Sequence, residues 1–105
     1  EFGDTVARAV RFCSDEEGDS RKERKQLTYA RMRDDIERHA GDPFVDMGVK
    51  AKVADRLANS IASRKNNPRL LKVYRSEQPT FRATLHQPGQ CDAMWALLEE
   101  VLGEE

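Results

Sequence analysis

Residues 70–86 read LLKVYRSEQPTFRATLH, and their hydrophobic spacing decides the fold that we expect. Apolar residues alternate with polar ones in two segments, at Leu71 and Val73 and again at Phe81, Ala83 and Leu85. The polar run 76–79, which ends in a proline, separates the two segments. A period of two is typical of β-strands, and a short proline-containing run between two such segments favours a turn. The stretch therefore predicts a β-hairpin over 70–86.

Helical spacing dominates on both sides of this stretch. The clearest stripe recurs every four residues, at Val49, Val53, Leu57 and Ile61. It predicts a helix over 49–65, with Asp46 as its N-cap and the run 66–68 as its end. Shorter apolar stripes predict helices over 4–13, 27–40 and 92–102. We therefore expect an α+β fold, mostly α, in which three to four helices pack with one β-hairpin.

Length and composition predict one small domain. The chain has 105 residues, of which 38% are hydrophobic and 35% charged, so part of it is expected to be solvated. Residues 14–25 contain no hydrophobic side chain and are typical of a linker. We expect residues 1–3 to be a cloning-site remnant, residues 4–26 to be a short helix with a charged linker, and residues 27–105 to be a single globular binding domain.

The net charge of −1 hides a strongly basic middle segment. Residues 50–85 carry nine Lys or Arg against two acids. Residues 1–49 carry nine bases against twelve acids, and residues 86–105 carry five acids and no base. Such segregation of charge favours a polyanionic partner for the middle of the chain.

One face of the 49–65 helix offers chemistry that suits nucleic acid. Lys52, Arg56, Asn59 and Ser63 are spaced at i, i+4, i+7 and i+11, which predicts a shared exposed ridge opposite the apolar stripe. Lys and Arg suit phosphates, and Asn suits an adenine edge. A charged helix face that serves only solubility is the alternative interpretation.

The expected hairpin adds a second basic surface. An aromatic ring among cations can stack on a base. If the apolar residues of the hairpin face the core, the residues that point outward together are Lys72, Tyr74, Arg82 and Thr84. A helix followed by a basic hairpin resembles the recognition helix and wing of winged-helix DNA-binding domains, over about residues 27–86. The resemblance is one of architecture, and the chain departs from it because only the short run 42–48 separates the 27–40 helix from the 49–65 helix.

These patterns predict a non-catalytic domain that binds nucleic acid, most simply DNA. Phosphate contacts are expected from Lys50, Lys52, Arg56, Arg69, Lys72 and Arg75, and Arg82 is expected on the same polyanion-binding surface. Base-edge contacts are expected from Asn59 and Ser63, and stacking from Tyr74. The alternative is an adaptor domain that binds an acidic or apolar partner segment, for which Trp95 and Leu98 on the last helix would supply an apolar strip.

Signals for an enzyme, a cofactor or a metal are weak. The candidate nucleophiles and bases are Cys13, Cys91, His39 and His86, and nothing in their spacing indicates a shared pocket. No paired Cys or His spacing indicates a zinc site, and the scattered glycines form no phosphate-binding loop. We therefore expect no enzymatic activity, no cofactor and no metal.

Membrane insertion is not expected, because no apolar run approaches the roughly 20 residues that a transmembrane helix needs. The two cysteines lie in a highly charged chain without a secretory signal pattern. This combination predicts an intracellular, reducing compartment, either the cytoplasm or the nucleus.

Overall fold

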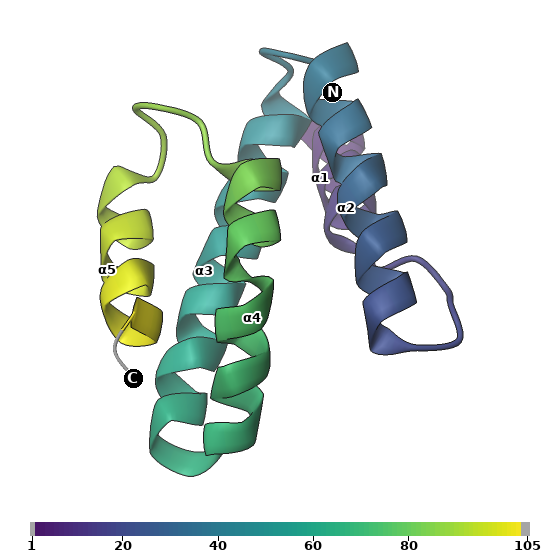
Figure 1. The fold of residues 1–105 in the computed structure, drawn as a ribbon. Coiled ribbons are helices and arrows are strands. Elements are labelled where there is room, and N and C mark those ends of the chain that lie inside the picture. Colours follow the sequence, from purple (N-terminus) through teal and green to yellow (C-terminus); the bar gives the residue numbers. More distant parts are fainter. Residues whose placement is uncertain (1, 104–105) are drawn as a thin grey trace. The chain divides into compact units, whose positions relative to one another are not determined.

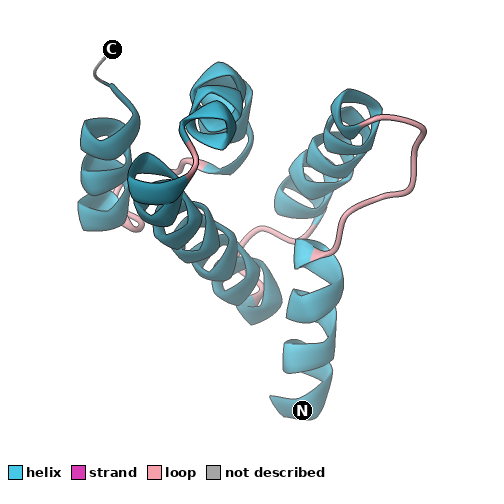
Figure 2. Cartoon of the chain, turned by 90° about the horizontal axis from the view of Figure 1, so that it is seen from below, coloured by secondary structure: helices cyan, strands magenta, loops and turns pink. Residues whose placement is uncertain are grey.

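The computed structural model describes residues 2–103, and every regular element in that range is a helix (Figures 1 and 2). The helices are α1 (Phe2–Cys13), α2 (Arg21–Arg38), α3 (Pro43–Asn66), α4 (Pro68–Leu85) and α5 (Asp92–Gly103). The chain divides into two compact units, residues 1–51 and 52–105, and α3 contributes to both. The expected α+β fold is therefore wrong, because the described residues contain no strand.

The predicted hairpin is the helix α4. Asn67 caps this helix, since its side-chain oxygen accepts a hydrogen bond from the Leu70 amide at 3.2 Å, and Pro68 occupies the first turn, where a missing N–H costs nothing. The buried residues of its central face include Tyr74, Gln78, Phe81 and Leu85. Their spacing of four, three and four residues is that of a helix facing a core.

The expected turn lies inside this helix. Pro79 is exposed in the interior of α4, and because proline has no N–H to donate, the helix has one backbone hydrogen bond fewer there. A proline on the solvent-facing side is tolerated when the opposite face is packed. Without a hairpin there is no wing, so the winged-helix-like arrangement is also wrong.

The other four predicted helices are present, and three of them begin earlier than the sequence predicts. The 4–13 and 92–102 helices are confirmed as α1 and α5. Helix α2 starts before residue 27, because Ser20 accepts a hydrogen bond from the Glu23 amide at 3.1 Å and thereby caps the basic end of the predicted linker. Helix α3 starts at Pro43, and it is the Asp42 carboxylate that accepts from the Phe44 amide at 3.1 Å.

The core of the first unit forms around one aromatic ring. Phe12 of α1 is 1% exposed, and it lies against the start of α3 at Gly48. A Cβ atom added at Gly48 would lie 2.5 Å from Phe12 Cδ2, so only glycine permits this close approach. Met32 of α2 and Val45 of α3 are also fully buried.

The core of the second unit lies chiefly between α4 and α5. Phe81 of α4 and Trp95 of α5 are both buried, with ring centroids 5.6 Å apart. Leu98 and Leu102 continue the buried face of α5. Figure 1 shows α4 running back along the second half of α3 after a very short connection. None of the described helices is long and apolar enough to cross a membrane.

Replacing Gly48 by alanine is expected to destabilise the protein. The clash with the buried Phe12 ring should cost about 1–3 kcal/mol, which exceeds the gain of up to about 1 kcal/mol in helix propensity. Urea unfolding followed by circular dichroism measures the change. Gly3→Ala is the matched control, since nothing lies within 4 Å of a Cβ added there and the stability should stay level or rise. A Gly48→Ala variant as stable as Gly3→Ala would contradict the packing described here.

Candidate nucleic-acid interface

The second half of α3 presents a different face to the core than its apolar spacing predicts. Arg56 is 6% exposed and Ser63 is 5% exposed, whereas Ile61 is 48% exposed. A stripe that repeats every four residues turns by about 40° per step around a helix of 3.6 residues per turn. By Ile61 the apolar stripe has therefore left the core, and the expected exposed ridge is wrong at Arg56 and Ser63.

Arg56 is buried between α3 and α4. Its guanidinium carbon lies 4.3 Å from the centroid of the Phe81 ring and 4.6 Å from that of Tyr74. Its Nη2 atom lies 3.3 Å from Glu77 Oε1, and the two side chains are 7% and 16% exposed. The charge that the sequence assigned to phosphate contact is therefore paired inside the protein.

Two further residues of the predicted polyanion-binding surface interact with α5. Arg75 Nε donates a hydrogen bond to the carbonyl oxygen of Leu102 at 2.6 Å. Arg82 Nη1 lies 3.2 Å from Glu99 Oε2, and its guanidinium carbon is 5.7 Å from the centroid of the Trp95 ring. The acidic last helix thus takes up part of the basic charge of α4.

Four other cations remain exposed where α3 meets α4. We call this group the basic tip, and it consists of Arg64, Lys65, Arg69 and Lys72. Within residues 2–103, none of the four forms an ion pair or a side-chain hydrogen bond. No acidic residue lies in the sequence between Asp55 and Glu77.

Helix geometry brings the cations of the basic tip to one end of two helices. A single residue, Asn67, separates the last turn of α3 from the first turn of α4, so these two turns lie at the same end of the helix pair (Figure 1). The negative dipole end of α3 and the positive dipole end of α4 offset each other there, so the side-chain charges dominate. These exposed side chains can therefore bind anions.

The sequence identified only half of the basic tip. Arg69 and Lys72 were predicted as phosphate contacts, whereas Arg64 and Lys65 were not assigned a role. The signal that could have found them is their position directly before the helix-ending run 66–68. Lys52 is half-buried, and Lys50 is exposed on the part of α3 that belongs to the first unit.

The three predicted base-contact residues meet in one small cavity. This cavity has a volume of about 250 Å³ and is lined by Asn59, Ala62, Ser63, Asn66, Asn67, Leu70 and Tyr74. Asn59 Nδ2 donates to Asp55 Oδ2 at 3.3 Å, and Tyr74 is 7% exposed and packs on Arg56. The Tyr74 ring is therefore not displayed on an open surface for stacking.

Other chemistry finds little support in the described part of the chain. No three His, Cys, Asp or Glu side chains there come together in a group that could hold a metal ion. Cys13 and Cys91 are half-buried thiols, and Cys13 Sγ donates to the carbonyl oxygen of Gly48 at 3.4 Å. His86 lies edge-on to Trp95, with ring centroids 5.4 Å apart.

Comparisons with protein families, with curated proteins and with solved structures found no match to this chain. A functional assignment therefore depends on the chemistry of the site itself.

Removing one partner of the buried Arg56–Glu77 pair is expected to destabilise the second unit. Arg56→Ala should cost about 3–5 kcal/mol, because Glu77 then keeps a poorly solvated charge without its partner. The double variant Arg56→Met/Glu77→Leu should recover most of this loss, since an apolar pair of similar volume carries no desolvation penalty. Urea unfolding of the two variants and the wild type measures these changes in the free energy of unfolding. Equal destabilisation by Arg56→Ala and by the double variant would show that packing, not charge, dominates at this position.

Proposed function

We propose that this chain is a non-catalytic domain that binds nucleic acid, most simply DNA, through the basic tip. The observation that carries the proposal is the group of four exposed cations with no acidic partner among the described residues. Cations elsewhere on α4, such as Arg75 and Arg82, are held by α5 and are not part of the proposed contact surface.

The basic tip suits the phosphate backbone better than base edges. Arg64 and Arg69 can each hold a phosphate with two parallel N–H donors, and Lys65 and Lys72 supply compact charges. Base-edge contacts by Ser63 and stacking by Tyr74 are disfavoured because both side chains are buried. Phosphate contacts carry no sequence information, so binding is proposed to be largely independent of DNA sequence.

Fluorescence anisotropy with a random DNA duplex at several salt concentrations tests this function. Four phosphate contacts predict that the logarithm of the association constant falls with the logarithm of salt concentration at a slope of about −3.6. Absence of binding by micromolar protein at about 50 mM salt would overturn the proposal.

A pair of double variants separates the basic tip from general charge. Arg64→Gln/Arg69→Gln is expected to reduce the magnitude of the salt slope by about 2, since each lost phosphate contact removes about 1. Arg33→Gln/Arg38→Gln removes the same charge from exposed positions on α2 and should leave the slope unchanged. If both double variants weaken binding equally, the attraction is non-local and the basic tip has no special role.

A protein-interaction function is the second candidate, and an apolar hollow on the first unit favours it. The hollow has a volume of about 480 Å³ and is lined by Val6, Ala9, Val10, Cys13, Ser14, Met47 and Ala51. Val10 is 62% exposed, which is unusual for a large apolar side chain beside other apolar ones. An apolar partner segment would cover this surface.

Variants at the hollow distinguish this candidate from DNA binding. A partner protein that binds in the hollow should fail to bind the Val10→Glu variant and should still bind the Arg64→Gln/Arg69→Gln variant. Val10→Glu should in turn leave the affinity for the DNA duplex within a factor of about two, since it adds one charge and removes none of the cations of the basic tip. Capture that survives Val10→Glu would reject the hollow as the binding surface.

A further inference from the structure

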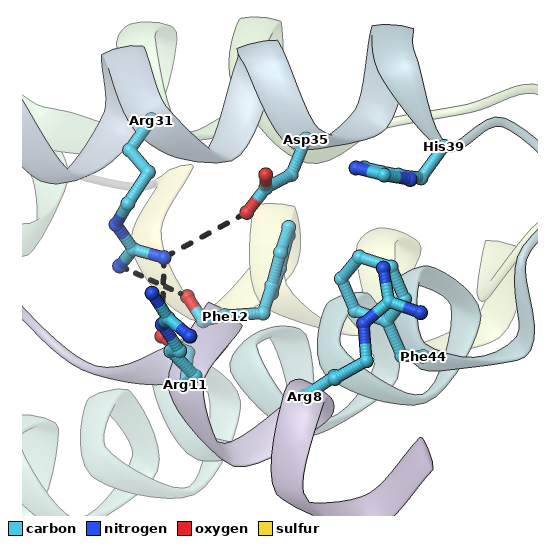
Figure 3. A pocket seen from close by; sticks show the side chains of 7 residues that line it. All are labelled: Arg8, Arg11, Phe12, Arg31, Asp35, His39 and Phe44. Atoms are coloured by element: carbon cyan, nitrogen blue, oxygen red, sulfur yellow. Dashed lines mark hydrogen bonds and ion pairs between the residues drawn. The ribbon is translucent and has the colours of Figure 1, made fainter. Parts of the chain in front are cut away.

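A second polar cavity lies in the first unit, between α1, α2 and the first turn of α3 (Figure 3). Its volume is about 200 Å³, and it is lined by Arg8, Arg11, Phe12, Arg31, Asp35, His39 and Phe44. Three arginines thus face one acid among the lining residues. This volume is below the range of about 300–1,000 Å³ for drug-sized ligands, so a small charged group fits better than a large organic molecule.

Arg31 forms the fixed wall of this cavity. Its guanidinium donates to the carbonyl oxygens of Arg11 at 3.0 Å and Phe12 at 3.2 Å, and also to that of Ser14. The Arg11 and Phe12 carbonyls belong to the last turn of α1, and the Ser14 carbonyl follows it, so Arg31 holds the end of α1 to α2. Glu16 and Asp35 pair with the same guanidinium, which is therefore a positioning group.

Arg8 and His39 flank a ring at the other end of the cavity. The guanidinium carbon of Arg8 lies 4.2 Å from the centroid of Phe44, and the imidazole of His39 lies edge-on to the same ring at 5.3 Å. Arg8 Nη1 forms a long ion pair with Asp42 Oδ2 at 3.5 Å. The ring fixes the orientation of Arg8, and guanidinium donors beyond this one pair remain for a ligand.

Arg11 is a lining arginine whose charge has no acidic partner within residues 2–103. Its side chain forms no ion pair or hydrogen bond within the described residues, although its backbone carbonyl accepts from Arg31. Figure 3 shows Arg8 and Arg11 reaching from α1 toward the helix that carries Arg31, Asp35 and His39. The one acid in the lining, Asp35, lies 3.8 Å from Arg31 Nη1, so part of its charge is offset by that group.

We propose that this cavity binds a small phosphate-bearing molecule, held by Arg11 and Arg8 with His39 as a further donor. A phosphate group offers three or more oxygens in different directions, whereas a planar carboxylate offers two. Arg11 lies at one end of the cavity and Arg8 and His39 lie at the other, so they can contact oxygens on different sides of such a molecule, which a planar carboxylate does not offer. The site is distinct from the basic tip and does not depend on nucleic-acid binding.

Amide and side-chain NMR of the full chain, titrated with inorganic phosphate, tests the proposal. Saturable shifts are expected at the His39 ring and at the backbone of Arg11 and Phe12. Acetate at the same ionic strength should bind at least about ten-fold more weakly, which is the effect of one lost charge-assisted hydrogen bond. O-phosphoserine as a second probe distinguishes a phosphomonoester, which would bind more tightly, from free phosphate. Acetate binding as strong as phosphate binding overturns the proposal.

Variants locate the site. Arg11→Gln is expected to raise the dissociation constant for phosphate about ten-fold or more without affecting the fold, because the side chain lies on the surface. Arg38→Gln, which removes a 72% exposed arginine from the same unit, should have no effect. Arg64→Gln/Arg69→Gln should also leave phosphate shifts at His39 unchanged, so failure of DNA binding and failure of this site are separable. Unaltered affinity in Arg11→Gln would refute the site.

Discussion

The burial of Arg56 determines how the second unit presents its charges. The guanidinium lies between the rings of Tyr74 and Phe81 and pairs with Glu77, so this face of α3 must point toward α4. Burying a charged pair is costly in desolvation, and the two rings and the carboxylate offset part of that cost by contacting the cation from several sides. Ser60 and Ser63 follow on the same face and are buried, while the cations after them remain in solvent.

Helices whose apolar residues recur at regular helical spacing could be predicted from the sequence, whereas α4 could not. The alternation of Leu71 with Val73, and of Phe81 with Leu85, is compatible with a strand. The true stripe passes through Gln78, a polar residue that is buried because its Nε2 donates to Glu99 at 3.0 Å. A buried side-chain amide whose hydrogen-bond partner lies on another helix looks like an exposed polar residue in a short stretch of sequence. The helical spacing of the buried residues was therefore hidden, and the alternation of apolar residues led to the prediction of strands.

The basic tip could be predicted only in part, because contacts between distant residues decide which cations are available. Local charge counting correctly marks residues 50–85 as basic, but it does not separate paired cations from available ones. The partner of Arg75 is a backbone carbonyl 27 residues away, and that of Arg82 is a carboxylate 17 residues away. Such tertiary pairs are invisible in the sequence, whereas the cations beside the 66–68 run could have been singled out because helix ends point into solvent.

The connection of α3 to α4 through one residue has a consequence for the thermodynamics of recognition. Cations mounted on the ends of two packed helices have an ordered backbone before any ligand arrives. Binding of a polyanion there would restrict side chains alone, at about 0.5–1.5 kcal/mol each, and would avoid the further 1–2 kcal/mol per residue, approximately, that a disordered basic tail loses on becoming ordered. Such a surface would associate as a rigid body, with no gain of helix in the complex.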